Sequence, residues 1–222
     1  MKKILFVFTC LASLASCTVK SNEEKARELI EPIVKASLIK PESFELAELR
    51  LDSCFTDDPE RNADVVALGI KLAEQYKDYK DNLADADDAE SYMSIYAPSY
   101  GYSSAHSKVE YRQYKEKMEI AKKKANAAKE NIVQLFKDNQ KLLENLNSRK
   151  HEFTGWMAIC SYRAETAGGM KTIGKRLLFL NKDMTEVTLH LDEEDMLKIK
   201  NSGIEDAKYE LGDELKDMFV DK

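Results

Sequence analysis

The chain has 222 residues, of which 33% are charged, and its formal net charge at pH 7 is −6. This acidic balance argues against nucleic acid as a partner, because binding to phosphates calls for a basic surface. The length suffices for one domain, or for one domain with an extension.

Residues 1–16 are typical of an export signal. Lys2 and Lys3 precede an apolar run from Ile4 to Leu14. A run of about eleven residues is too short for a bilayer, which needs roughly twenty. No other apolar run in the sequence is long enough to span a membrane. The sequence therefore predicts an exported chain whose body does not span the membrane.

The apolar run ends in Leu14-Ala15-Ser16-Cys17, which resembles the lipobox of bacterial lipoproteins. In that family the cysteine sulfur is attached to a lipid that carries two palmitate-type acyl chains, and the residues before the cysteine are removed. The resemblance implies a signal peptide over residues 1–16, a lipid anchor on Cys17 and a mature net charge of −8 after loss of two lysines. Thr18, in place of Asp, implies passage to the outer membrane, on its periplasmic or surface face. The alternative is an ordinary secretory signal with an incidental cysteine.

The segment from 17 to 56 is expected to supply the anchor, a helix and the first strand of an α+β domain. Ser21 or Asn22 can cap the helix. Pro32 lies inside its apolar pattern and predicts either a kink or a helix that begins near Glu31. The apolar positions of this helix recur at helical spacing: Ala26, Leu29, Ile30, Ile33, Val34 and Leu38.

Residues 43–55 alternate between apolar and polar as in a strand. The phase of the alternation changes near Ala47-Glu48. This change predicts a bulge, or a strand that is partly covered on both faces.

Residues 57–149 are expected to form an antiparallel coiled-coil hairpin inserted into that domain. From Ser107 to Arg149, steps of three and four alternate over about five heptads, as in a helix whose seam faces a partner. The seam consists of Tyr111, Tyr114, Met118, Ala121, Ala125, Ala128, Ile132, Leu135, Asn139, Leu142 and Leu146.

The second arm of the hairpin is expected between Asp57 and His106. Asp58-Pro59-Glu60 predicts its start, and Pro98 with Gly101 predicts the turn. Folding near residue 102 brings the acids of 81–90 opposite the lysines of 115–124. The alternative is an intermolecular coiled coil of the long helix with a second chain. The seam of the second arm repeats every seven residues: Val65, Leu72, Tyr79, Ala86 and Met93.

Tyrosines gather at the predicted tip of the hairpin: Tyr92, Tyr96, Tyr100 and Tyr102. Tyrosine is favoured at recognition surfaces because it combines apolar area with a polar end. The sequence therefore marks these four residues as a candidate partner-binding site. The alternative is that Tyr96, Tyr111 and Tyr114 only pack the seam between the two helices.

Residues 150–222 are expected to return to the α+β domain. Strands over 153–162, 173–180 and 186–191 form an antiparallel meander, which the strand from Phe44 joins. Helices follow over 192–199 and 204–219. The predicted fold class is α+β, with an N-terminal helix on an antiparallel sheet of about four strands, an inserted helical hairpin and C-terminal helices.

Two cysteines remain besides the predicted anchor and the signal segment, Cys54 and Cys160. Export permits a disulfide between them. Two small buried apolar side chains are the alternative, because pairing cannot be read from a sequence.

A second resemblance covers residues 24–55 and 150–190. Lys40-Pro41-Glu42-Ser43-Phe44 after a helix, then Arg163-Ala164 before Gly168-Gly169, is similar to a small uncharacterised exported bacterial domain. That pattern implies a single domain whose sheet is interrupted by the hairpin. It implies no catalytic residue.

The sequence offers no recognisable catalytic or metal-binding motif. His106, His151 and His190 lack the spacing of zinc ligands, and no nucleophile elbow or phosphate loop is present. We therefore expect no cofactor and a non-enzymatic, lipid-anchored envelope protein that presents its hairpin to a protein partner. The alternatives are an envelope immunity or exclusion protein, and a hydrolase with a scattered site.

Overall fold

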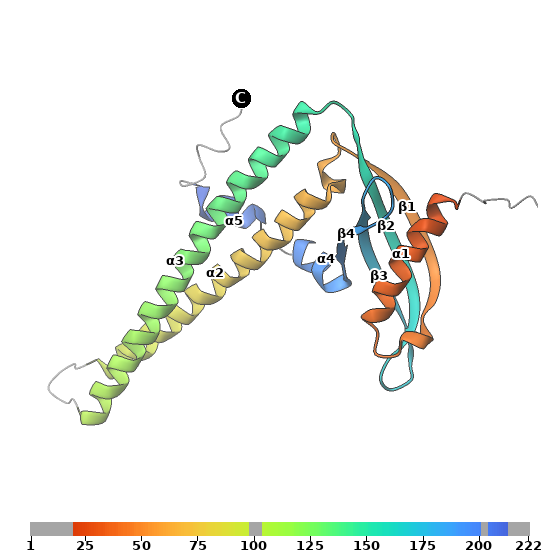
Figure 1. Cartoon of the computed structure of the whole chain (residues 1–222). Helices are drawn as coiled ribbons and strands as arrows, with labels where there is room; N and C mark the ends of the chain where they lie inside the picture. Colours follow the sequence, from red (N-terminus) through yellow and green to blue (C-terminus); the bar gives the residue numbers. More distant parts are fainter. Residues whose placement is uncertain (1–19, 98–103, 201–203, 213–222) are drawn as a thin grey trace, which may run out of the picture.

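The computed structural model describes residues 20–97, 104–200 and 204–212, and Figure 1 shows their arrangement. These residues form five α-helices and a four-stranded antiparallel sheet, which confirms the predicted α+β class. A long helical hairpin leans away from the sheet (Figure 1). The elements are α1 (Asn22–Ala36), β1 (Glu45–Phe55), α2 (Ala63–Tyr96), α3 (Ala105–Ser148), β2 (Phe153–Glu165), β3 (Lys171–Leu180), β4 (Val187–Leu191), α4 (Glu193–Lys200) and α5 (Ile204–Glu210), with 3-10 turns at Pro41–Ser43 and Pro59–Arg61.

Helix α1 begins with a capping box. The Glu24 backbone N–H donates to Ser21 Oγ over 3.2 Å, and the Ser21 backbone N–H donates to Glu24 Oε2 over 2.8 Å. The helix continues through Pro32, so the expectation that it begins near Glu31 is wrong. Buried side chains before the proline (Ala26 and Ile30) and after it (Val34) pack on the sheet, and this packing keeps the segment helical.

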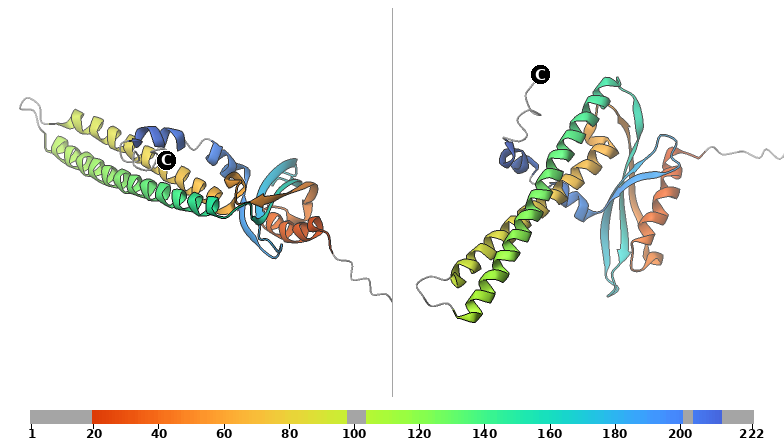
Figure 2. Two further views of the ribbon diagram at one scale, coloured as in Figure 1. Left: turned by 90° about the horizontal axis from the view of Figure 1, so that it is seen from above. Right: turned by 60° about the vertical axis from the view of Figure 1, so that its left-hand side comes forward.

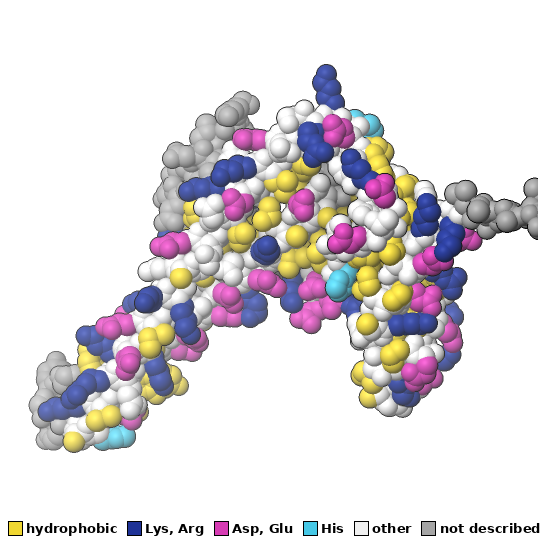
Figure 3. Space-filling model, in the orientation of Figure 1, with side chains coloured by type: hydrophobic (Ala, Val, Ile, Leu, Met, Phe, Trp, Pro, Cys, Tyr) yellow, Lys and Arg dark blue, Asp and Glu magenta, His cyan; other side chains and the backbone are white. Residues whose placement is uncertain are grey.

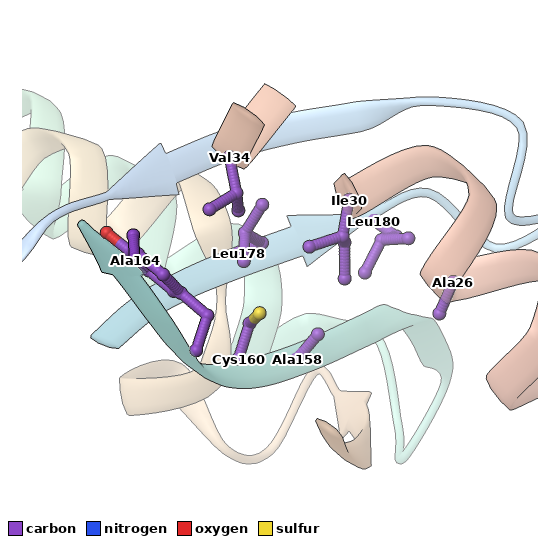
Figure 4. Close-up of a cluster of buried hydrophobic side chains, with 9 residues drawn as sticks. Ala26, Ile30, Val34, Ala158, Cys160, Ala164, Leu178 and Leu180 are labelled. Atoms are coloured by element: carbon purple, nitrogen blue, oxygen red, sulfur yellow. The ribbon is translucent and has the colours of Figure 1, made fainter. Parts of the chain in front are cut away.

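The sheet has the order β1-β2-β3-β4, so the strand from Phe44 joins the predicted meander at its edge. The register of β1 against β2 shifts between Leu46 and Glu48, which confirms the bulge predicted from the change of phase. Figure 4 shows how side chains of α1, β2 and β3 meet in the core of this layer. The buried members of that core are Ala26, Ile30, Val34, Ala158, Cys160, Tyr162, Ala164, Leu178 and Leu180.

The Lys40–Phe44 segment closes the turn between α1 and β1 against the end of β2. Ser43 Oγ donates to the Lys40 carbonyl over 2.7 Å and accepts from the Glu165 backbone N–H over 2.8 Å. Lys40 Nζ also pairs with Glu165 Oε2 at 3.1 Å. The Phe44 ring lies 5.7 Å from the Tyr162 ring. This segment therefore has a structural role, which is to tie the first strand to the second.

The two cysteines lie on neighbouring strands but far apart. In the register of β1 and β2, Cys54 lies opposite Gly155 and Cys160 opposite Leu49. Five residue pairs separate them, on the order of 17 Å, and the odd number places them on opposite faces of the sheet. A disulfide needs Cα atoms within about 7 Å. Both thiols are free and buried, so the disulfide alternative is wrong. Burial raises the pKa of each thiol to about 11, so both are protonated at neutral pH.

Helices α2 and α3 pack together as an antiparallel hairpin, as the heptad pattern predicted. The start of α2 differs from the prediction: Pro59–Arg61 forms a 3-10 turn, and Asn62 caps the helix by accepting from Asp64 and Val65 N–H over 3.0 and 3.2 Å. These two N–H groups have no acceptor within the helix, and the Asn62 side chain supplies one. The Pro59–Arg61 turn has no such side-chain cap. Small buried residues bring the helices close together: Ala86, Ala89, Ala121, Ala125 and Ala128.

Helix α5 packs across one side of the hairpin, and the distal end extends beyond it (Figure 2). Ala207 and Leu211 contact the seam of the hairpin, and Lys80 Nζ pairs with Glu210 Oε1 at 2.8 Å. Burial, reinforced by the nearby Glu210 carboxylate, raises the pKa of Tyr76. The part of the predicted last helix beyond residue 212 lies outside the described residues. The hairpin side of this cluster consists of Leu72, Tyr76, Ile132 and Phe136.

The base of the hairpin is fastened to the sheet by a buried threonine. Thr56 Oγ1 donates to the Arg149 carbonyl over 2.5 Å and accepts from the Glu152 backbone N–H over 3.0 Å. Beside it, His151 Nδ1 lies 2.8 Å from both carboxylate oxygens of Asp57. This hydrogen bond lowers the pKa of the Asp57 carboxyl below its ordinary value. Both ends of the insertion are thus held at one point, which sets the direction of the hairpin.

Candidate functional site: the distal groove of the hairpin

The distal part of the hairpin carries a cluster of three tyrosines. Tyr92 and Tyr96 lie one turn apart near the end of α2, and Tyr114 of α3 stacks on both. The ring centroids of Tyr114 lie 5.1 Å from Tyr92 and 5.8 Å from Tyr96, with interplanar angles of 17° and 5°. Lys117 Nζ stands 4.8 Å from the centroid of the Tyr114 ring. The cluster joins the two helices close to the tip and fixes the orientation of its aromatic faces.

The beginning of α3 places Tyr114 in this cluster. Ser104 caps the helix, because its Oγ accepts from the Ser107 backbone N–H over 3.0 Å. Tyr114 and Ala121 then lie seven residues apart on the seam, so both face α2. The tyrosine cluster is therefore a direct result of the heptad spacing.

A groove of about 380 Å³ runs beside this cluster between α2 and α3. Its apolar surface includes Tyr92, which is 50% exposed, and Ile120, which is 49% exposed. Large apolar side chains exposed beside one another are typical of a binding surface. The groove is lined by Asn82, Asp85, Asp88, Ala89, Tyr92, Tyr114, Lys117, Ile120, Ala121 and Lys124.

The two walls of this groove carry opposite charges. Asp85 and Asp88 stand on the α2 wall, and Lys117 and Lys124 stand on the α3 wall. Within the described part of the chain, none of these four side chains has an ion-pair partner within 4.0 Å. Figure 3 shows that charged side chains of both signs are interspersed with hydrophobic ones along the hairpin.

The opposite flank of the hairpin is closed by contacts within the chain. Lys122 Nζ pairs with Glu90 Oε2 at 3.3 Å, which is one of the predicted acid–lysine pairs across the seam. Helix α5 also lies on this flank. Tyr76, which α5 covers, and Asp85, which lines the groove, are nine positions apart, or about half a turn around the helix. The groove therefore lies on the flank that α5 leaves open.

Two of the four predicted binding residues, Tyr92 and Tyr96, are brought together in this cluster. Tyr100 and Tyr102 lie outside the described residues, as does Cys17. Tyr96 and Tyr114 stack across the seam, as the packing alternative expects, and partner binding at this cluster stays a prediction. Sequence reasoning missed Ile120, although an isoleucine that lies off the heptad seam of a long helix is a signal of apolar exposure.

A larger cavity of about 760 Å³ lies between α2, α4 and α5. Its three lysines are already paired with carboxylates: Lys77 with Asp81 at 2.6 Å, Lys80 with Glu210 at 2.8 Å and Lys198 with Glu194 at 3.3 Å. These pairs neutralise the lysines of the cavity, whose lining also includes the acids Glu74 and Asp206.

The histidines do not form a site with one another. His106 lies in the first turn of α3, His151 stands at the base of the hairpin and His190 lies on the edge strand β4. Among the described residues, no group of three or more His, Cys, Asp or Glu side chains is arranged to hold a metal ion. No helix in the described ranges is both long and apolar enough to cross a membrane.

No family model, no curated protein and no solved structure matches the chain.

Proposed function

We propose that this chain is a lipid-anchored protein of the bacterial cell envelope, held in the outer membrane through Cys17, and that it binds a protein partner with the distal groove of its hairpin. The anchor rests on the resemblance of residues 14–17 to a lipobox. The binding role rests on the groove, where Tyr92 and Ile120 are half exposed beside Asp85 and Asp88 on the α2 wall and Lys117 and Lys124 on the α3 wall. Its role is one of binding or scaffolding, without chemistry on a substrate.

The geometry of the hairpin supports this role. At about 1.5 Å per residue, the 44 residues of α3 extend roughly 65 Å. The base is fixed by Thr56, and α5 braces the middle, so the groove is carried on a supported arm. A supported arm loses little conformational freedom on binding, which favours affinity.

The anchor is tested by replacing Cys17 with serine in the producing cell. We expect the wild type to incorporate labelled palmitate and to remain in the membrane fraction, because its sulfur accepts the acyl chains. The Cys17→Ser chain should lose both properties. Cys10 lies within the signal segment that is removed, so Cys10→Ser should retain them. Labelling that persists in Cys17→Ser would refute lipidation at this residue.

The binding role is tested by photocrosslinking in living cells. A photoreactive phenylalanine analogue placed at Ile120, in the groove, is expected to give a discrete protein adduct on illumination. The matched control is the same analogue at Asn126, which is exposed and lies one turn from Lys122 on the opposite flank. We expect the control to give no discrete adduct. Equal adducts at both positions, or none at Ile120, would contradict the proposal.

A further inference from the structure

We propose that the occupant of the distal groove is a second copy of this chain, and that two hairpins associate side by side with their tips pointing in the same direction. This inference rests on the proposed function, because it names the partner of the same groove. It is carried by the distribution of charge on the two walls: Asp85 and Asp88 on α2, Lys117 and Lys124 on α3.

Most homodimers have twofold symmetry, so the same patch must be complementary to itself. Two symmetric ways exist to lay one groove on another. If the twofold axis runs along the hairpin, the tips point the same way and α2 of each copy lies over α3 of the other. If the axis runs across the hairpin, the tips point in opposite directions and α2 lies over α2.

The charges distinguish these two arrangements. With tips parallel, the Asp85 and Asp88 wall of one copy meets the Lys117 and Lys124 wall of the other at the same height, because all four residues line one groove. With tips antiparallel, carboxylates face carboxylates and ammonium groups face ammonium groups, which is strongly unfavourable. The groove is therefore self-complementary only in the parallel arrangement.

The apolar surface of the groove fits the same arrangement. Tyr92 lies on the α2 wall and Ile120 on the α3 wall. Across the twofold axis, Tyr92 of each copy therefore meets Ile120 of the other copy. The result is a four-helix bundle over the distal half of the hairpin, in which these apolar side chains and the opposite charges meet across one interface. Two chains anchored in one membrane already present their hairpins in the same direction, which favours this pairing over the antiparallel one.

The test is a charge reversal of each wall in the full-length, acylated chain purified in detergent. Mass from sedimentation equilibrium is expected to give a dimer for the wild type. Asp85→Lys with Asp88→Lys makes both walls basic, and Lys117→Glu with Lys124→Glu makes both acidic. Each variant alone should be monomeric, with a dissociation constant raised about a hundredfold or more. An equimolar mixture of the two variants should form a dimer again, because each basic wall of one variant then faces an acidic wall of the other.

The mixture shows whether the variants are still folded, since unfolded chains would not pair. The matched control is Asp87→Lys with Glu90→Lys, which makes the same change in net charge on α2 outside the groove. It removes the Glu90–Lys122 pair, but an exposed pair contributes little to stability, so the dimer should stay intact. A monomeric wild type, a dimer insensitive to both reversals, or a mixture that stays monomeric would each overturn the inference. If the Ile120 adduct in cells then contains a different protein, the proposed function stands and only the second copy is excluded.

Discussion

Replacing Gly155 with alanine is expected to lower the free energy of unfolding by about 3 kcal/mol, since a strained φ and a crowded Cβ each cost roughly 1–3 kcal/mol. Gly155 has a φ of +152°, which L side chains rarely adopt. An added Cβ would clash with the backbone carbonyl oxygen of Leu180, which cannot move without disturbing the pairing of β2 with β3. The chain therefore depends on glycine at this point, where the hairpin returns to the sheet.

The matched substitution is Gly69→Ala in α2. Nothing lies within 4 Å of a Cβ built at Gly69, and the residue is helical, so alanine should raise the free energy of unfolding by about 0.5–1 kcal/mol. Urea unfolding of both variants, followed by circular dichroism, measures the two effects. Equal stability of Gly155→Ala and the wild type would show that the strand can relax around the new side chain.

Much of the hairpin could be predicted because the heptad is a local pattern. Ala121, Ala125, Ala128 and Ile132 were placed on the seam by spacing alone, and all four are buried. The start of α2 was misplaced because proline and acids at 58–60 resemble a helix start. Asn62 competes with them, and its side chain makes the capping hydrogen bonds.

Contacts between distant segments were harder to predict. The pattern of 204–219 indicates a helix, but a short apolar stripe does not say which surface it covers, so the packing of Ala207 against the hairpin was not foreseen. The relation of Cys54 to Cys160 depends on the register of two strands that the hairpin separates in the sequence. Register of this kind follows from the packing of the whole sheet.

The candidate site was predicted in part. Tyr92 and Tyr96 stood out by composition, but their stacking on Tyr114 depends on the pairing of the two helices. The site also depends on the charges of both groove walls, and these charges lie together only when α2 and α3 pack side by side. A surface built from two helices cannot be read from either one alone.

Ile132→Ala is expected to lower the free energy of unfolding by about 2–5 kcal/mol, the range for truncating a large side chain in a core. Ile132 is 0% exposed and packs where α2, α3 and α5 meet, so its loss leaves a cavity that three helices would have to close. Each of these helices is held by the others, which limits relaxation into the cavity. Urea unfolding at a concentration where the chain is monomeric gives the value.

The matched control, Ile120→Ala, changes the same residue type on the same helix. Ile120 is 49% exposed, so truncation should change the free energy of unfolding by less than about 1 kcal/mol. The two isoleucines thus separate two kinds of apolar surface on α3: one is buried and holds the hairpin together, and the other is exposed in the proposed binding groove. If Ile120→Ala cost as much as Ile132→Ala, Ile120 would be part of the core, and the distal groove would lose its apolar surface for binding.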